Sequence, residues 1–283
     1  MSPKIGIAVD STCDLPADWP YLDRIHIIPE HIRFNDKDYR EGVDITEAEF
    51  YQRIEEMGII PKTSQPSPGE FAEFYQQLAD RYDVLISIHL GAKLSGTYQS
   101  AVLGAQMVDK DITIYPVDSN NGSAGVGFMA DEAMRMIDAG ATPEAILHRM
   151  ETLRDRIEIF LTPRDLTFAR MSGRVNALSA FIASVLHITP IIILTDGELI
   201  ASERARSRKQ AAVKMVGMMK ERLGDGPVNI AIIHSQAPED VDLFRKAILA
   251  AFQPQKLWIT TLSSSVSVHL GPGTIGIVGY QTD

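Results

Sequence analysis

The chain has 283 residues, with 27 Lys+Arg and 37 Asp+Glu, so its formal net charge is −10. Hydrophobic residues make up 45% and charged residues 23%, a balance that is typical of a folded globular protein and excludes a largely disordered chain. The acidic charge argues against nucleic-acid or anionic-membrane binding, because both need a basic surface. A single cysteine, Cys13, excludes an intrachain disulfide and a cysteine-based zinc cluster, and no metal or cofactor is predicted.

The N-terminus and the longest apolar window bear on localisation. A short apolar run over 5–9 follows the first few residues directly, without the pattern of a secretion signal, so we expect a cytoplasmic protein. The apolar window 177–194 contains Pro190, which would break a membrane-spanning helix. We interpret this window as a buried helix over 177–186 and a buried strand over 190–194, so no integral membrane segment is predicted.

The predicted elements alternate along the chain. Short apolar runs rich in β-branched residues predict strands at 5–9, 84–88, 112–117, 157–161, 188–194, 228–233, 257–261 and 275–278. Helical patterns occur at 47–57, 68–81, 96–108, 124–139, 143–155, 207–223 and 239–251. The segment 25–34, followed by the polar residues 36–38, reads as an additional strand and turn. This alternation is typical of parallel βαβ units with helices on both faces of a sheet.

Several element ends carry clear local signals. Thr46 with Glu49, and Ser67 with Glu70, fit the capping box at a helix start. Thr142 precedes Pro143 and Glu144 in the same way. The pair 196–197 is Asp-Gly, which predicts a type I′ hairpin between 191–194 and 199–202.

These patterns predict an α/β protein of two lobes. We expect a parallel-sheet N-terminal α/β lobe over 1–154 and a mixed-sheet C-terminal α/β lobe over 155–283. The segment 60–80 could instead pack with the second lobe, and this alternative stays open. Ligands of open α/β sheets collect beyond the carboxyl ends of strands or in the crevice between lobes, so we expect the ligand there.

Two segments resemble nucleotide-binding motifs in sequence but lack a feature that the motif requires. Residues 271–276 match G-x-G-x-x-G literally, but the predicted strand 275–278 follows where the dinucleotide fingerprint requires a helix. Residues 91–97 resemble a phosphate loop, but Thr97 stands where the phosphate-binding lysine belongs. Nucleotide binding is therefore disfavoured, although the helix start near 96 still offers backbone N–H groups to an anion.

Three polar clusters lie where the predicted chain turns: 63–67, 94–97 and 269–273. Their hydroxyl groups, helix N-terminus and histidine can donate hydrogen bonds to a carboxylate or a phosphate. No carboxylate pair and no activated nucleophile accompanies them, so the pattern favours binding over hydrolysis.

Each cluster also has a purely structural interpretation. Ser67 fits a helix cap, and Ser95 is as well explained by a cap as by a binding role. Thr63 and Ser64 suit an ordinary turn equally well. His269, in a glycine-rich segment interpreted as a loop, is more often structural than functional.

Other polar residues favour structural roles. The run 10–14 is either a site or an Asx-type turn, and Cys13 has no activating base beside it. His89, at the end of an apolar strand, fits a buried and satisfied imidazole. The basic run that contains Arg204, Arg206 and Arg208 is interpreted as a solvated helix start.

The polar segments occur in an order that is similar to a known family. They are Val-Asp-Ser-Thr at 9–12, Thr-Ser-Gln-Pro-Ser at 63–67, Leu-Ser-Gly-Thr-Tyr-Gln-Ser-Ala at 94–101, Val-Asp-Ser at 117–119, Ser-Gly-Arg at 172–174 and His-Leu-Gly-Pro-Gly at 269–273. Together they resemble the DegV family of bacterial fatty-acid-binding proteins, the binding subunits of fatty acid kinase. The resemblance spans about residues 5–279.

The resemblance implies a long-chain fatty acid such as palmitate, held in a tunnel between the two lobes. It implies that the hydroxyl groups of Thr63 and Ser95 meet the ligand carboxylate, with Ser64, Gly96 and His269 nearby. It further implies a separate kinase subunit that phosphorylates the bound acid, and a surface arginine, Arg174, that docks this kinase. The protein itself would then be a lipid-binding accessory subunit and not an enzyme.

Elementary energetics favours a ligand with a long apolar tail. A hydroxyl donor contributes only about 0.5–1.5 kcal/mol net, whereas each buried methylene contributes about 0.8 kcal/mol. Candidate apolar lining residues occur in one segment, and they are Phe168, Phe181, Ile182, Val185, Leu186 and Ile188. An enzyme acting on a small phosphorylated or carboxylated metabolite, with His269 as general acid, and a purely regulatory module remain the alternatives.

Overall fold

The computed structural model describes residues 3–176 and 189–282. The chain divides into two compact units, Met1–Asp155 and Arg156–Asp283. Both units are α/β, one with a parallel sheet and the other with a mixed sheet, as the sequence predicts. The predicted helix 177–186, together with Phe181, Ile182, Val185, Leu186 and Ile188, lies outside the described residues.

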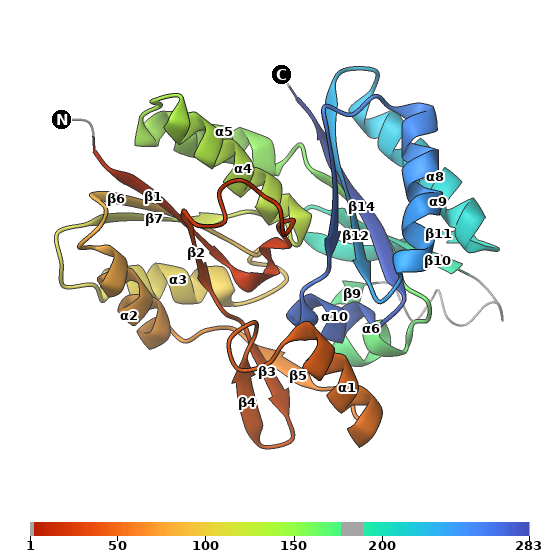
Figure 1. The fold of residues 1–283 in the computed structure, drawn as a ribbon, viewed down its shortest axis with the longest axis horizontal. Coiled ribbons are helices and arrows are strands. Elements are labelled where there is room, and N and C mark those ends of the chain that lie inside the picture. The colour runs from red at the N-terminus through yellow and green to blue at the C-terminus, as the bar shows by residue number, and fades with distance from the viewer. Residues whose placement is uncertain (1–2, 177–188, 283) are drawn as a thin grey trace. The chain divides into compact units, whose positions relative to one another are not determined.

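A four-stranded parallel sheet forms the centre of the first unit. Its strands are β1 (Ile5–Asp10), β2 (Ile25–Ile28), β6 (Val84–His89) and β7 (Thr113–Asp118), in the order β2-β1-β6-β7. Four helices cover its two faces: α2 (Pro68–Leu78) and α3 (Thr97–Gln106) on one, α4 (Ala124–Asp138) and α5 (Pro143–Arg154) on the other (Figure 1). The helices α2 and α3 pack on the sheet through a buried cluster that includes Phe71, Tyr75 and Leu85.

A small antiparallel sheet completes this unit. It contains β3 (His31–Phe34), β4 (Lys37–Arg40) and β5 (Lys62–Ser64), in the order β4-β3-β5, and α1 (Glu47–Met57) follows β4 in the chain. The prediction of a single strand over 25–34 is wrong, because this segment forms β2 and β3 in two different sheets. The break falls at Pro29 and Glu30, and Pro29 has no backbone N–H to continue a ladder.

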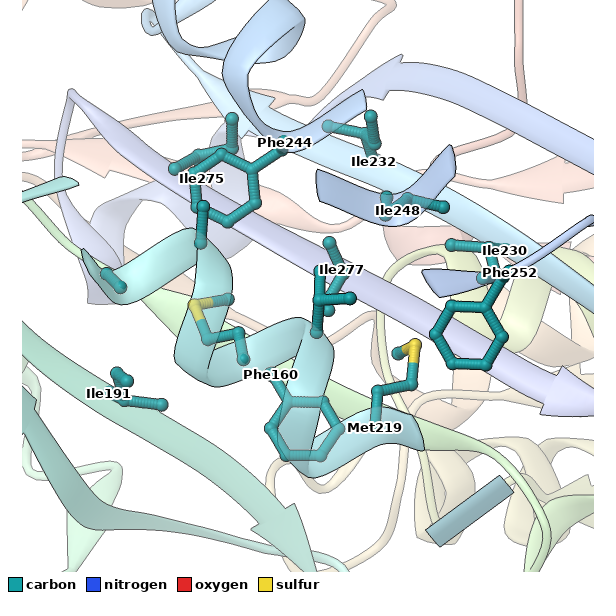
Figure 2. Packing of buried hydrophobic residues seen from close by; sticks show 14 of the residues in the cluster. Phe160, Ile191, Met219, Ile230, Ile232, Phe244, Ile248, Phe252, Ile275 and Ile277 are labelled. Carbon is teal, nitrogen blue, oxygen red and sulfur yellow. The ribbon is translucent and has the colours of Figure 1, made fainter. Parts of the chain in front are cut away.

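The second unit is built on a seven-stranded mixed sheet. Its strands are β8 (Glu158–Thr162), β9 (Val175–Asn176), β10 (Thr189–Thr195), β11 (Glu198–Ala205), β12 (Val228–Ser235), β13 (Lys256–Thr261) and β14 (Thr274–Gln281), in the order β13-β12-β14-β8-β10-β11-β9. Its helices are α6 (Thr167–Ser172), α8 (Arg208–Leu223), α9 (Pro238–Ala251) and α10 (Ser264–Leu270). Figure 2 shows Met219 of α8 and Phe244 of α9 in one buried cluster with Phe160 and Ile277 of the sheet.

The local signals are confirmed. Both capping boxes form, at Thr46 and at Ser67, and the Thr142 hydroxyl accepts a hydrogen bond from the N–H of Ala145. Strands β10 and β11 pair across Asp196 and Gly197, which have φ of +50° and +75° as a type I′ turn requires.

Two short helices escape the sequence prediction. The segment 264–270 is helix α10, so the interpretation of His269 as a loop residue is wrong: it lies in the last turn of this helix. Helix α6 has six residues. Both are too short for an amphipathic repeat to stand out, and propensity alone does not predict helices of this length.

Candidate functional site

Four of the predicted site residues lie in the first unit. Thr63 and Ser64 belong to β5, where they pair with Ile32 and His31 of β3. The side chain of Thr63 is half-buried and that of Ser64 is exposed. Ser95 and Gly96 are half-buried in the turn that leads into α3, so their position at a helix N-terminus is confirmed.

The structure brings these two segments together through Gln65. A Cβ atom placed on Gly96 would lie 2.7 Å from Gln65 Nε2, so the Gln65 side chain rests directly on the glycine. The polar segment that follows β5 therefore contacts the start of α3. The start of α3 offers backbone N–H groups and the Ser95 hydroxyl beside the Gln65 side chain, and such donors suit an anionic group.

Ser95 is not the N-cap residue of α3. Gly96 is the N-cap residue of α3 and makes no side-chain cap, while Ser95 Oγ accepts a long, 3.3 Å hydrogen bond from the N–H of Thr97. Ser95 Oγ also lies 2.8 Å from Thr97 Oγ1, where either hydroxyl can donate. One helix end thus holds two hydroxyl groups in direct contact.

A buried glutamate, which the sequence analysis did not single out, continues this chain of hydroxyls. Glu30 is 4% exposed and Thr97 is 0% exposed, and Glu30 Oε1 lies 2.7 Å from Thr97 Oγ1. Burial, together with the negative charges of Asp10 and Glu41, raises the pKa of Glu30 well above its ordinary value. A signal was available, because Glu30 follows the carboxyl end of a parallel strand, where ligand-binding side chains collect.

The 10–14 segment forms an Asx-type turn. Asp10 Oδ1 accepts hydrogen bonds from Thr12 N (3.1 Å) and Thr12 Oγ1 (2.5 Å), at the start of the short 3₁₀ helix η1 (Ser11–Cys13). Burial raises the pKa of the Cys13 thiol well above its ordinary value, which agrees with an inert residue.

His89 has the expected structural role. Its Nε2 lies 2.7 Å from Ser87 Oγ and its Nδ1 lies 3.2 Å from Asp10 Oδ2, and both ring nitrogens are buried. The hydrogen-bonded series Ser87, His89 and Asp10 resembles the catalytic triad of a hydrolase. However, Ser87 is 0% exposed and also accepts a hydrogen bond of 2.9 Å from the hydroxyl group of Tyr75, so no substrate reaches it.

His269 and Arg174 lie in the second unit. His269 is half-buried, and burial together with the nearby charge of Arg174 lowers the pKa of its imidazole to about 4. With a pKa of about 4 the imidazole is mostly neutral at pH 7, and a neutral imidazole can donate one hydrogen bond. Arg174 is exposed and donates a hydrogen bond of 3.2 Å to the carbonyl oxygen of Ser172.

The glycine-rich turn after His269 packs closely against neighbouring side chains. Gly271 and Gly273 have φ of +83° and +79°, and a Cβ on either residue would collide with Phe168 or Arg164, respectively. Arg208 donates hydrogen bonds to the carbonyl oxygens of Thr162 and Gly273. Arg208 begins α8, so the predicted helix start is confirmed there, but the interpretation of its side chain as solvated is wrong.

Within residues 3–176 and 189–282, three or more His, Cys, Asp or Glu side chains nowhere gather in a way that could hold a metal ion. In the same ranges, every helix is too short or too polar to cross a membrane.

Comparisons with known proteins agree with this architecture. The curated Protein DegV of Bacillus subtilis is 31% identical over 276 residues, which are 97% of this chain and 98% of that protein. A solved DegV family protein from Thermus thermophilus, described by its fatty acid binding, has a TM-score of 0.91 at 30% identity and covers 99% of this chain and 100% of its own. The solved structure of DegV from Bacillus subtilis, described as a fatty acid binding protein, has a TM-score of 0.88 at 30% identity, with coverage of 99% and 100%.

The family assignment rests on the whole chain. The family model described as "Uncharacterised protein, DegV family" matches residues 4–282. The match includes all three sheets and all the polar segments discussed above. The chain therefore belongs to the DegV family.

Proposed function

We propose that this protein binds a long-chain fatty acid and holds its carboxylate through neutral hydrogen-bond donors. The observation that carries the proposal is the contact of Gln65 with Gly96, which brings the Thr63–Ser64 segment to the start of α3 beside Ser95. Relatives with solved structures that are described as fatty acid binding support the same ligand class.

The proposed head-group site contains Thr63, Ser95, Ser64 and Gly96 from the first unit and His269 from the second. The pKa of about 4 suits His269 for this role, because a neutral imidazole donates a hydrogen bond without bringing a buried charge. As the family resemblance implies, the proposal includes an acyl chain in a tunnel between the two predicted lobes, 1–154 and 155–283.

The free energy of binding comes mainly from the tail in this proposal. At about 0.8 kcal/mol per buried methylene, a long acyl chain outweighs the head-group hydrogen bonds, which contribute about 0.5–1.5 kcal/mol each. The head group then fixes the orientation of the ligand and selects an acid over an uncharged lipid.

The proposal extends to acyl-phosphate formation in the cytoplasm. In it, a separate kinase subunit phosphorylates the carboxylate of the bound acid, and Arg174 on the exposed surface docks that kinase. The exposed guanidinium of Arg174 supports a contact with another protein, because arginine is enriched in protein interfaces. In this role the protein carries the ligand and performs no chemistry itself.

Native mass spectrometry of the gently purified protein tests the binding proposal. The expected result is a co-purifying mass of a long-chain fatty acid, followed by saturable rebinding of palmitate after delipidation. A protein that carries no lipid and does not bind added palmitate, while binding small phosphorylated metabolites, contradicts the proposal and favours the enzyme alternative.

A further inference from the structure

The hydroxyl groups of Ser95 and Thr97 and the carboxyl group of Glu30 form a continuous chain. The distances are 2.8 Å from Ser95 Oγ to Thr97 Oγ1 and 2.7 Å from Thr97 Oγ1 to Glu30 Oε1. Thr97 is fully buried and Glu30 nearly so, whereas Ser95 is half-buried at the open end. The chain thus runs from the interior of the first unit to the residue that faces the proposed carboxylate.

Each hydroxyl group has one hydrogen, so the direction of donation along the chain depends on where the proton of Glu30 lies. When Glu30 is ionised it can only accept, so Thr97 donates to Glu30. Ser95 must then donate to Thr97, since otherwise two lone pairs face each other at 2.8 Å. Ser95 Oγ also accepts from Thr97 N, so its single hydrogen is used within the protein.

The arrangement reverses when Glu30 carries a proton on Oε1, the oxygen that faces Thr97. The Glu30 carboxylic acid then donates to Thr97 Oγ1, and the Thr97 hydroxyl donates to Ser95 Oγ. The hydrogen of Ser95 is left for a ligand. The heavy-atom positions are the same in both arrangements, so the change needs no movement of the fold.

We propose that Glu30 is a positioning residue that controls, through Thr97, whether the Ser95 hydroxyl can donate to the carboxylate of the ligand. This inference rests on the proposed function. It deepens that function by adding regulation by pH: the protonated site binds an acid, and the ionised site releases it.

The surroundings of Glu30 favour its protonated form. Asp10 at the end of β1 and Glu41 after β4 are the charged groups that act on it, and both are acidic. Ser11, which accepts a 3.0 Å hydrogen bond from the N–H of Glu30, donates one of 2.6 Å to Glu41. Together with burial, these charges raise the pKa of Glu30 well above its ordinary value.

Charge repulsion between an ionised Glu30 and a fatty acid anion would also weaken binding at high pH, so the experiment must separate the two effects. We suggest comparing palmitate with 2-heptadecanone, a neutral isostere whose carbonyl oxygen accepts a hydrogen bond but carries no charge. Affinities of both ligands are measured from pH 6 to pH 9 with the native protein and with Glu30→Gln. The carboxyl resonance of Glu30 is followed in parallel by ¹³C NMR.

The expected result is that both ligands bind the native protein about two- to tenfold more weakly once Glu30 is ionised. This factor corresponds to the loss of one hydrogen bond. With Glu30→Gln, both affinities stay constant across this pH range. A ketone affinity that does not change with pH while that of palmitate falls overturns the inference in favour of charge repulsion. A Glu30 carboxyl that does not titrate between pH 5 and pH 9 also overturns it.

A second variant keeps the test valid if Glu30→Gln does not fold. Thr97→Val keeps the side-chain shape but cuts the chain, so the affinity for 2-heptadecanone should no longer depend on pH. A dependence that persists in this variant contradicts the role of Thr97. Failure of the proposed function looks different, because neither ligand then binds the native protein at any pH.

Discussion

Arg208 Nη1 donates a 2.6 Å hydrogen bond to the carbonyl oxygen of Thr162, 46 residues earlier in the chain. The same guanidinium reaches the carbonyl oxygen of Gly273, and its Nε lies 3.2 Å from Asp240 Oδ2. Arg208 thus connects the end of β8, the start of α9 and the glycine-rich turn that follows His269. A residue at the start of a helix holds the second unit together where part of the proposed site lies.

Replacement of Arg208 by Lys should destabilise the second unit. Lysine keeps the charge but cannot reach two carbonyl oxygens and a carboxylate at once, because it lacks the planar fork. We expect the free energy of unfolding to fall by about 1–3 kcal/mol, measured by urea denaturation. Arg206→Lys, at an exposed position two residues away, is the matched control and should change little. Equal stability of the two variants would show that the Arg208 contacts are unimportant.

Replacement of Ser95 by Ala should weaken fatty acid binding much more than it lowers stability. A head-group hydrogen bond contributes about 0.5–1.5 kcal/mol net, so the dissociation constant for palmitate should rise about two- to tenfold. The fold loses the long hydrogen bond from Thr97 N and the 2.8 Å hydrogen bond with Thr97 Oγ1, both local to the start of α3. Thr142→Ala removes the true cap of α5 and should show the opposite pattern, with about 1 kcal/mol less stability and unchanged binding. A large drop in melting temperature with intact affinity would assign Ser95 to capping.

The stability of the native protein should fall as Glu30 ionises. The pKa of Glu30 is raised in the folded state, so above the unfolded pKa of 4.5 the folded protein binds more protons than the unfolded chain. The stability that Glu30 contributes in its protonated form is therefore lost as pH rises through the folded pKa. Glu30→Gln should therefore be more stable relative to the native protein at pH 8 than at pH 5. Urea denaturation at the two pH values measures this difference, with the exposed Glu55→Gln as control. A difference that does not grow with pH contradicts a raised pKa.

His269 should destabilise the fold in acid. Burial first, and then the charge of Arg174, lower the pKa of its imidazole to about 4, below the ordinary 6.5. The unfolded chain therefore binds more protons between these values, and stability is lost as pH falls from about 6.5 toward 4. At pH 5 the native protein should lose about 1–2 kcal/mol relative to His269→Gln. The exposed His148→Gln should not show this difference, and a similar result for both variants would argue against burial as the cause.

Arg174→Ala separates docking from ligand binding. In the proposed role, the variant keeps its affinity for palmitate within about twofold, while phosphorylation of the bound acid by the kinase falls strongly. Arg170→Ala, an exposed arginine on α6, is the matched control. Because the charge of Arg174 acts on His269, a loss of palmitate affinity as large as that of Ser95→Ala would place Arg174 in the head-group site instead.

The sequence alone predicted the features that depend on neighbouring residues. The capping boxes at Thr46 and Ser67 and the hairpin at 196–197 need only side chains within three or four positions, so the local pattern is sufficient. The alternation of apolar runs and helical patterns predicted the α/β class for the same reason. Short elements such as α10 were missed because seven residues carry too little periodicity.

The tertiary structure decided which distant side chains meet. Three contacts join residues that are far apart in the chain. Gln65 meets Gly96 across 31 positions, and Thr97 meets Glu30 across 67. Arg208 meets Thr162 across 46 positions. Such contacts depend on the order of strands in the sheets and on the break at Pro29, which separates β2 from β3. A local pattern does not encode strand order, because the free energy that selects it comes from burying whole faces of helices and sheets together.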